Sequence, residues 1–189
     1  NSEANKTGQV PYRPYSRKGT PLNTLVPYGL GASMDASLAR IETQHGDIDS
    51  YVAKALGYKL DDLPRVFSAE QIDAIALAIN NVSNGDAFII GDQTGIGKGR
   101  VVAGAIRFAH KQGMTPIFVT EKPDLYGDMF RDLTDIEWSK SLGRDPEIFM
   151  TNAGATVPLD DEAVDWIAAK DEAKTAGLPQ PARTGRFMP

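Results

Sequence analysis

The chain has 189 residues, of which 41% are hydrophobic, and a formal net charge of −5 from 20 basic and 25 acidic side chains. This length suffices for one domain with a sizeable core. The acidic balance excludes a surface saturated with Lys and Arg, so any contact with nucleic acid must be local. The absence of cysteine excludes disulfides and cysteine-based zinc sites, and two histidines are too few for a typical histidine zinc site.

The sequence contains no run of 18 apolar residues and no signal peptide, which predicts a soluble cytoplasmic protein without a membrane partner. Because it starts at Asn1 rather than Met, we expect it to be part of a longer polypeptide. We divide it into four parts: an extended basic arm (1–32), a helical scaffold (33–66), an α/β region (67–157), and a final helix with a tail (158–189).

The arm contains four prolines and shows neither a helical nor a strand period, which predicts an extended segment. It carries four basic residues against one acidic residue. Tyr12 and Tyr15, with these basic residues, could stack on and neutralise a nucleic-acid strand. The alternative is an arm that lies over the surface of the domain.

The helical scaffold is expected to contain two short amphipathic helices between residues 33 and 58, separated at Gly46. Ser33 and Asp47 are the residue types that begin helices, because their side-chain oxygens accept from the free N–H groups of the first turn. These helices are expected to act as structural support.

The next helix follows Phe67 and is expected to begin with Ser68 as its N-cap, with apolar residues recurring at helical spacing up to Ile79. Its first turn contains Gln71. A side-chain amide offers a donor and an acceptor, which match the N6 and N7 edge of adenine. The alternative is an ordinary surface glutamine.

A glycine-rich loop follows the apolar run Ala87-Phe88-Ile89-Ile90 and reads Gly-Asp-Gln-Thr-Gly-Ile-Gly-Lys-Gly-Arg, residues 91–100. Its glycines allow backbone N–H groups to turn inward around an anion. Residues 101–111 have helical spacing, so the start of a helix faces the same point, and Lys98 adds a positive charge. The pattern indicates a phosphate-binding loop of the Walker A type; the alternative is a strand-to-helix turn with an incidental lysine.

This loop departs twice from the pattern G-x-x-x-x-G-K-[ST]. Asp92 stands where the pattern has glycine, a mild change because neighbouring glycines can form the turn. Gly99 stands where a hydroxyl would bind Mg²⁺, which leaves the metal ligands unassigned.

Two further apolar runs, residues 115–120 and 147–151, indicate buried strands, with a helix at 125–136 between them. Strands alternating with helices predict an α/β fold with a parallel sheet and right-handed crossovers, in which ligands bind at the carboxyl ends of the strands.

The last part is expected to contain a helix at 162–176. Asp160, Asp161 and Glu162 resemble the metal-binding acidic pair of many NTPases, but the preceding residues are too short and proline-containing to form the required strand. We interpret Asp160 or Asp161 as a helix cap and the other acids as first-turn charges.

Four segments together resemble the start of a superfamily 2 helicase core, and more narrowly the strawberry notch family with its bacterial and phage relatives. They are PYRPYSRKG with LVP in the arm, FSAEQIDAIALAI, IIGDQTGIGKGRVVAGAI and DLYGDMFRDLTDI. Gly-Lys-Gly-Arg in place of Gly-Lys-Thr is a feature of that family's loop.

The resemblance implies a partial RecA-like P-loop lobe over residues 67–157, with ATP and Mg²⁺ as cofactors. It implies that Lys98 is catalytic and that Thr120 and Lys122 contact nucleic acid. The nucleotide-binding residues that it implies are Gln71, Thr94, Gly95, Ile96, Gly97, Lys98, Gly99 and Arg100. Arg100 has no role that we can derive.

The function that we expect is therefore the ATP-binding part of a larger ATP-dependent helicase or translocase, in some phage relatives one that acts against host restriction. A second RecA-like lobe and the metal-binding acids would lie beyond residue 189, so these residues alone are expected not to hydrolyse ATP. Two alternatives remain: a P-loop module that binds nucleotide without hydrolysis, and a P-loop phosphotransferase.

Overall fold

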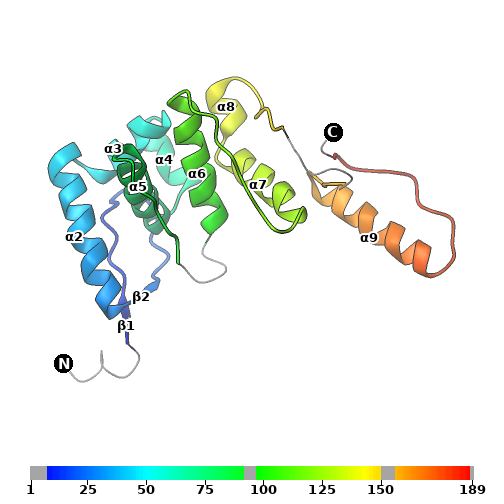
Figure 1. Cartoon of the computed structure of the whole chain (residues 1–189), viewed down its shortest axis with the longest axis horizontal. Helices are drawn as coiled ribbons and strands as arrows, with labels where there is room; N and C mark the ends of the chain where they lie inside the picture. The colour runs from blue at the N-terminus through cyan, green and yellow to red at the C-terminus, as the bar shows by residue number, and fades with distance from the viewer. Residues whose placement is uncertain (1–7, 92–96, 150–155, 188–189) are drawn as a thin grey trace. The chain divides into compact units, whose positions relative to one another are not determined.

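The computed structural model describes residues 8–91, 97–149 and 156–187. The chain forms two compact units, residues 1–116 and 117–189, which are described separately (Figure 1). The elements of the first unit are β1 (Gln9–Pro11), β2 (Leu25–Pro27), α2 (Tyr28–His45), α3 (Ile48–Leu56), the 3₁₀ turn η1 (Leu60–Asp62), α4 (Leu63–Val66), α5 (Ala69–Ser83) and α6 (Lys98–Lys111). Those of the second are α7 (Asp124–Asp135), α8 (Trp138–Leu142) and α9 (Asp161–Thr175).

Helix α5 is the centre of the first unit, and α2, α3 and α6 all pack against it (Figure 1). Residues 72–79 of α5 are all buried, with Ile72 and Ile75 fully inaccessible to solvent. Gly104 of α6 lies against α5 so closely that a Cβ atom there would come within 2.8 Å of Ile75 Cδ1. Burial of apolar surface between these helices is therefore the main source of stability.

Two of the predicted N-caps in the first unit are confirmed by the structure. Asp47 accepts a hydrogen bond from Ser50 N at the start of α3, and Ser68 accepts one from Gln71 N at the start of α5. The prediction that Ser33 begins a helix is wrong. Helix α2 begins directly after Pro27, and Ser33 lies inside it with its hydroxyl 3.4 Å from the carbonyl oxygen of Gly29.

The arm contains a short antiparallel pair that the sequence did not predict. Strands β1 and β2 pair Val10 with Val26, and Pro11 with Leu25. Just beyond the prolines at the strand ends, Tyr12 N donates to Thr24 O and Tyr28 N donates to Gly8 O, each at 2.9 Å, so the pairing continues by one hydrogen bond at either end.

The predicted parallel sheet, and with it the partial RecA-like lobe, is wrong for this structure. The sheet was predicted from three apolar runs, and in the described ranges none of them forms a strand: 87–90, 115–120 and 147–149. The sheet found in these ranges is the antiparallel pair of β1 and β2. The apolar side chains of the three runs are largely exposed, 89% for Ile89, 83% for Ile117 and 91% for Phe149. An apolar run indicates a buried strand only if neighbouring strands supply its hydrogen bonds.

The second unit places α7 and α8 against each other, with Leu133, Ile136 and Trp138 buried. Asp160 caps α9 by accepting from Ala163 N at 2.9 Å, so of the two predicted capping residues it is Asp160 that begins the helix, and Asp161 lies in its first turn. The Asp160 carboxylate also accepts from Arg186 N at 3.0 Å and so holds the tail against the start of α9. The three acids at 160–162 therefore belong to a helix start.

Candidate nucleotide-binding site

The first component of the candidate site is the start of α6. Gly97 precedes this helix with φ 76° and ψ 40°, a left-handed conformation that glycine adopts without the steric cost of a side chain. Its carbonyl oxygen accepts a hydrogen bond from Arg100 N at 3.1 Å. The N–H groups of the first turn and the helix dipole favour an anion at this end of α6. Thr94, Gly95 and Ile96 lie outside the described residues.

The second component is Gln71, which the structure brings to the same place. Its Nε2 donates to the carbonyl oxygen of Gly97 at 3.3 Å. This hydrogen bond joins the first turn of α5 to the N-cap residue of α6. Its Oε1 accepts from Ser68 N at 3.0 Å, while Ser68 Oγ accepts from Gln71 N at 3.3 Å. This reciprocal capping box explains why a glutamine stands three residues after the cap.

The capping box is a role that the sequence analysis missed, although Ser-x-x-Gln is its signature. A glutamine amide can accept two hydrogen bonds and donate two. The bonds to Ser68 and Gly97 therefore orient the amide and do not by themselves prevent it from binding the edge of a base.

Lys98, Gly99 and Arg100 form the first turn of α6, and all three are partly buried. Arg100, for which the sequence offered no role, places Nη1 3.5 Å from the carbonyl oxygen of Val66 at the end of α4. Lys98 is the first residue of α6, at the end of the helix where the dipole favours an anion.

A magnesium ion is the usual companion of a nucleotide in a P-loop, and the described residues do not fit one. Gly99 brings no hydroxyl to the first turn of α6. No group of three or more His, Asp or Glu side chains that could hold a metal ion occurs within the described ranges.

Thr120 and Lys122, the predicted nucleic-acid contacts, belong to the second unit. Lys122 N donates to Thr120 Oγ1 at 3.4 Å, and the side chain of Lys122 is exposed. The two residues are thus neighbours at the turn that leads into α7. The first unit, in contrast, contains Gln71, Gly97, Lys98, Gly99 and Arg100.

The arm lies on the helices of the first unit. This is the second of the two predicted arrangements, in which the arm covers the surface of the domain. Arg17 forms ion pairs with Glu42 and Asp47, and Lys18 forms one with Asp61. Each is an exposed pair that contributes little to stability, but each neutralises a charge that the nucleic-acid interpretation required.

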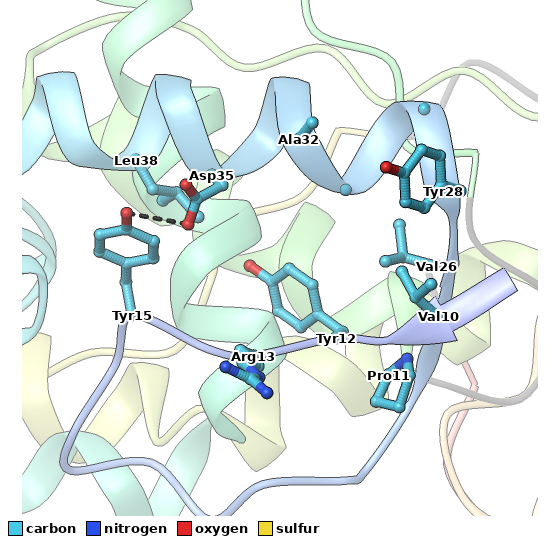
Figure 2. Close-up of a pocket in the computed structure, with 12 residues that line it drawn as sticks. Val10, Pro11, Tyr12, Arg13, Tyr15, Val26, Tyr28, Ala32, Asp35 and Leu38 are labelled. Atoms are coloured by element: carbon cyan, nitrogen blue, oxygen red, sulfur yellow. Dashed lines mark hydrogen bonds between the residues drawn. The ribbon is translucent and has the colours of Figure 1, made fainter. Parts of the chain in front are cut away.

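A pocket of about 280 Å³ lies between the arm and α2 (Figure 2). The rings of Tyr12, Tyr15 and Tyr28 lie along it, and the Tyr15 hydroxyl donates to Asp35 Oδ1 at 3.0 Å. The Tyr12 hydroxyl is bound to Asp73 Oδ2 at 2.7 Å. Because these two hydroxyls bind the protein's own carboxylates, the pocket presents mainly apolar surface.

Asp73 is a fully buried carboxylate that binds the arm. Burial raises its pKa from 3.8 to about 6, hydrogen bonds from Tyr12, Tyr15 N and Ser16 N oppose this rise, and the nearby Asp49 adds to it. Because the folded state then binds the proton more tightly than the unfolded state, the contribution of Asp73 to stability falls as the pH rises through the interval from about 4 to 6.

We therefore expect wild-type protein to lose stability relative to Asp73→Asn as the pH rises from 4 to 7, by an amount on the order of 2 kcal/mol. Subtracting the variant cancels the titration of the other carboxylates. The measurement is urea unfolding of both proteins at each pH. A difference in unfolding free energy that does not change with pH would show that the pKa of Asp73 is ordinary.

A family model described as P-loop containing NTP hydrolase pore-1 matches residues 37–154. This region includes α5, the glycine-rich loop, α6 and the turn at Thr120 and Lys122. No curated protein and no solved structure matches the chain significantly. No helix in the described ranges is both long enough and apolar enough to cross a membrane. Because the match covers well over half of the sequence, the chain belongs to the P-loop containing NTP hydrolase pore-1 family.

Proposed function

We propose that the chain binds ATP at the start of α6, and that its hydrolysis drives a helicase or translocase acting on nucleic acid. The observation that carries the proposal is the hydrogen bond of Gln71 Nε2 to Gly97 O. This hydrogen bond places the Gln71 amide, which can recognise a base, beside the start of α6, which favours binding of a phosphate. Membership of an NTP hydrolase family supports the same ligand.

The phosphate part of the proposal depends on the backbone and on one cation. The left-handed Gly97 and the first turn of α6 offer N–H donors, and Lys98 offers an ammonium group at the same end of the helix. Such a site binds the phosphates of any nucleotide. Selectivity for ATP must therefore come from Gln71.

The nucleic-acid part is supported by the resemblance of the sequence to the strawberry notch family and by the exposure of Lys122. In this proposal Thr120 and Lys122 bind the phosphate backbone, and a second lobe of the RecA type completes the catalytic site. Such a protein acts on nucleic acid in the cytoplasm. If it is encoded by a phage, this is the cytoplasm of the bacterial host.

A second candidate function is nucleotide binding without hydrolysis. Gly99 supports it, because a P-loop without its hydroxyl ligand loses a metal contact but keeps the phosphate-binding backbone. Nucleotide turnover in the presence of DNA separates the two candidates. Binding without turnover favours the second.

The experiment that tests the site compares Gln71→Ala with wild-type protein in binding to ATP and GTP. We expect wild-type protein to prefer ATP, because on the edge where adenine offers the N6 donor and the N7 acceptor, guanine offers two acceptors, O6 and N7. Loss of a base contact worth roughly 1–3 kcal/mol should bring the two affinities together.

The matched control is Gln112→Ala, which truncates an exposed glutamine just after the opposite end of α6. It should keep the preference for ATP. An unchanged ratio of ATP to GTP affinity in Gln71→Ala would mean that Gln71 serves only the capping box.

A further inference from the structure

The arm is bound to α5 through a buried carboxylate. Asp73 accepts from the backbone N–H groups of Tyr15 at 2.8 Å and of Ser16 at 2.9 Å, and from the hydroxyl of Tyr12 at 2.7 Å. Asp73 is inaccessible to solvent. Three donors on one buried carboxylate fix the position of the arm, since each would be costly to leave without an acceptor.

A second buried carboxylate binds the same segment to α3. Asp49, 1% exposed, accepts from Ser16 Oγ at 2.5 Å, from Arg17 N at 2.7 Å and from Lys18 N at 3.1 Å. The arm therefore bridges two helices through carboxylates, Asp49 and Asp73, that are 24 residues apart in the sequence.

The following residues of the arm complete the start of α5. Thr20 O accepts from Ala69 N at 3.1 Å, so an arm carbonyl satisfies one of the N–H groups that lack a partner within a helix. Leu22 N donates to the carboxylate of Glu70 at 2.9 Å. At Gly19 an added Cβ would lie 2.6 Å from Ala69 Cα, so only glycine permits this approach of the two backbones.

The turn of α5 that the arm holds is the turn that contains Gln71. Ala69 and Glu70 contact the arm, and the next residue donates to Gly97 O at the start of α6. A displacement of this turn would therefore move the amide of Gln71 away from Gly97. The arm and the candidate site share one helical turn.

From these contacts we infer that residues 12–22 are a positioning element of the nucleotide site. They hold the first turn of α5 so that Gln71 meets both Gly97 and the base of a bound nucleotide. The inference rests on the proposed function, and it adds a segment that lies 49 to 59 residues before Gln71 in the sequence. Gly19 and Glu70 are positioning residues, since neither needs to touch the nucleotide.

The test compares Gly19→Ala with wild-type protein in calorimetric binding of ATP and of inorganic triphosphate. Triphosphate has no base, so it reports on the phosphate-binding backbone and Lys98 alone. We expect ATP affinity to fall about tenfold, the effect of one lost base contact, and triphosphate affinity to stay within about twofold. Gly29→Ala is the control, because an added Cβ there meets nothing within 4 Å.

Glu70→Ala serves as a milder second variant if Gly19→Ala does not fold, since it removes only the acceptor of Leu22 N. We expect a smaller loss for ATP and again none for triphosphate. Hydrogen exchange of peptides covering residues 68–73 and 97–103 gives a readout that needs no nucleotide. Exchange in both should rise in either variant.

The outcomes separate the inference from the proposed function. Unchanged ATP affinity and unchanged exchange in Gly19→Ala would overturn the inference, as would an equal loss for ATP and triphosphate. A different result would contradict the proposed function alone: wild-type protein binds neither ATP nor triphosphate, while hydrogen exchange of residues 68–73 and 97–103 rises in Gly19→Ala. In that case the arm still positions the turn that contains Gln71.

Discussion

In the intact protein, with the proposed second lobe that residues 1–189 lack, replacing Lys98 with alanine is expected to reduce ATP hydrolysis to background. Lys98 is the first residue of α6, directly after the left-handed Gly97, and its ammonium group is the cation that the loop sequence directs at the β- and γ-phosphates. In phosphoryl transfer, charge builds on the transferred group and its leaving oxygen, so a lost cation raises the barrier by several kcal/mol. Phosphate release with Mg²⁺ and ATP, with and without DNA, measures the effect.

The matched control is Lys111→Ala, which removes an exposed lysine from the last position of the same helix. It should hydrolyse ATP at the wild-type rate, because its ammonium group belongs to the opposite end of α6. Circular dichroism should show that both variants retain their helices. A measurable rate of hydrolysis that is the same in Lys98→Ala and in wild-type protein would exclude this loop as the phosphate site.

If neither wild-type protein nor Lys98→Ala turns over ATP, the second candidate function gains support. In that case Lys98→Ala should still weaken binding of ATP, since the interaction with phosphate does not depend on hydrolysis. Calorimetric titration of ATP into both proteins distinguishes this result from the complete absence of a site.

The helices could be predicted because their signals are local. Ser68, Asp47 and Asp160 each stand where a side-chain oxygen can reach an N–H three residues later, and the structure confirms all three caps. Ser33 shows the limit of this reasoning. A serine can begin a helix or lie inside one, and here the helix begins five residues earlier.

The prediction of a parallel sheet was wrong because strand formation depends on neighbouring strands, and a single apolar run does not show whether it has them. The runs around Ile89, Ile117 and Phe149 have the composition of buried strands, yet in the described ranges they lack a ladder and are exposed. The same holds for the site: Gln71 and Gly97 are 26 residues apart, and only the packing of α5 on α6 brings them together.

The arm was the least predictable part, although one residue gave a signal. Asp73 interrupts an otherwise apolar stretch of α5 that is buried throughout, and a buried carboxylate requires hydrogen-bond donors. The sequence does not say which segment supplies them. The structure assigns them to Tyr12, Tyr15 and Ser16.

The largest loss of stability is expected at Arg107, the largest fully buried side chain of the described core. From α6 its Nε donates to the carbonyl oxygen of Leu56 at 2.7 Å, and its guanidinium lies 4.2 Å from the centre of the Tyr58 ring. Leu56 is the last residue of α3, where carbonyl groups lack partners within the helix and a cation is favourable. Burial lowers the pKa of Arg107, and Tyr58 opposes this.

Arg107→Ala should lower the free energy of unfolding by about 3 kcal/mol, because it leaves a cavity and removes the donor to Leu56 O. Arg107→Met, which keeps most of the volume and removes the buried charge, should cost about 1 kcal/mol. Arg40→Ala on the exposed surface of α2 is the matched control and should lie within about 0.5 kcal/mol of wild type. Urea unfolding followed by circular dichroism measures all four proteins, with hydrogen exchange of α6 to locate the change. If Arg107→Ala and Arg40→Ala unfold at the same urea concentration, the contact between α6 and the end of α3 does not stabilise the first unit.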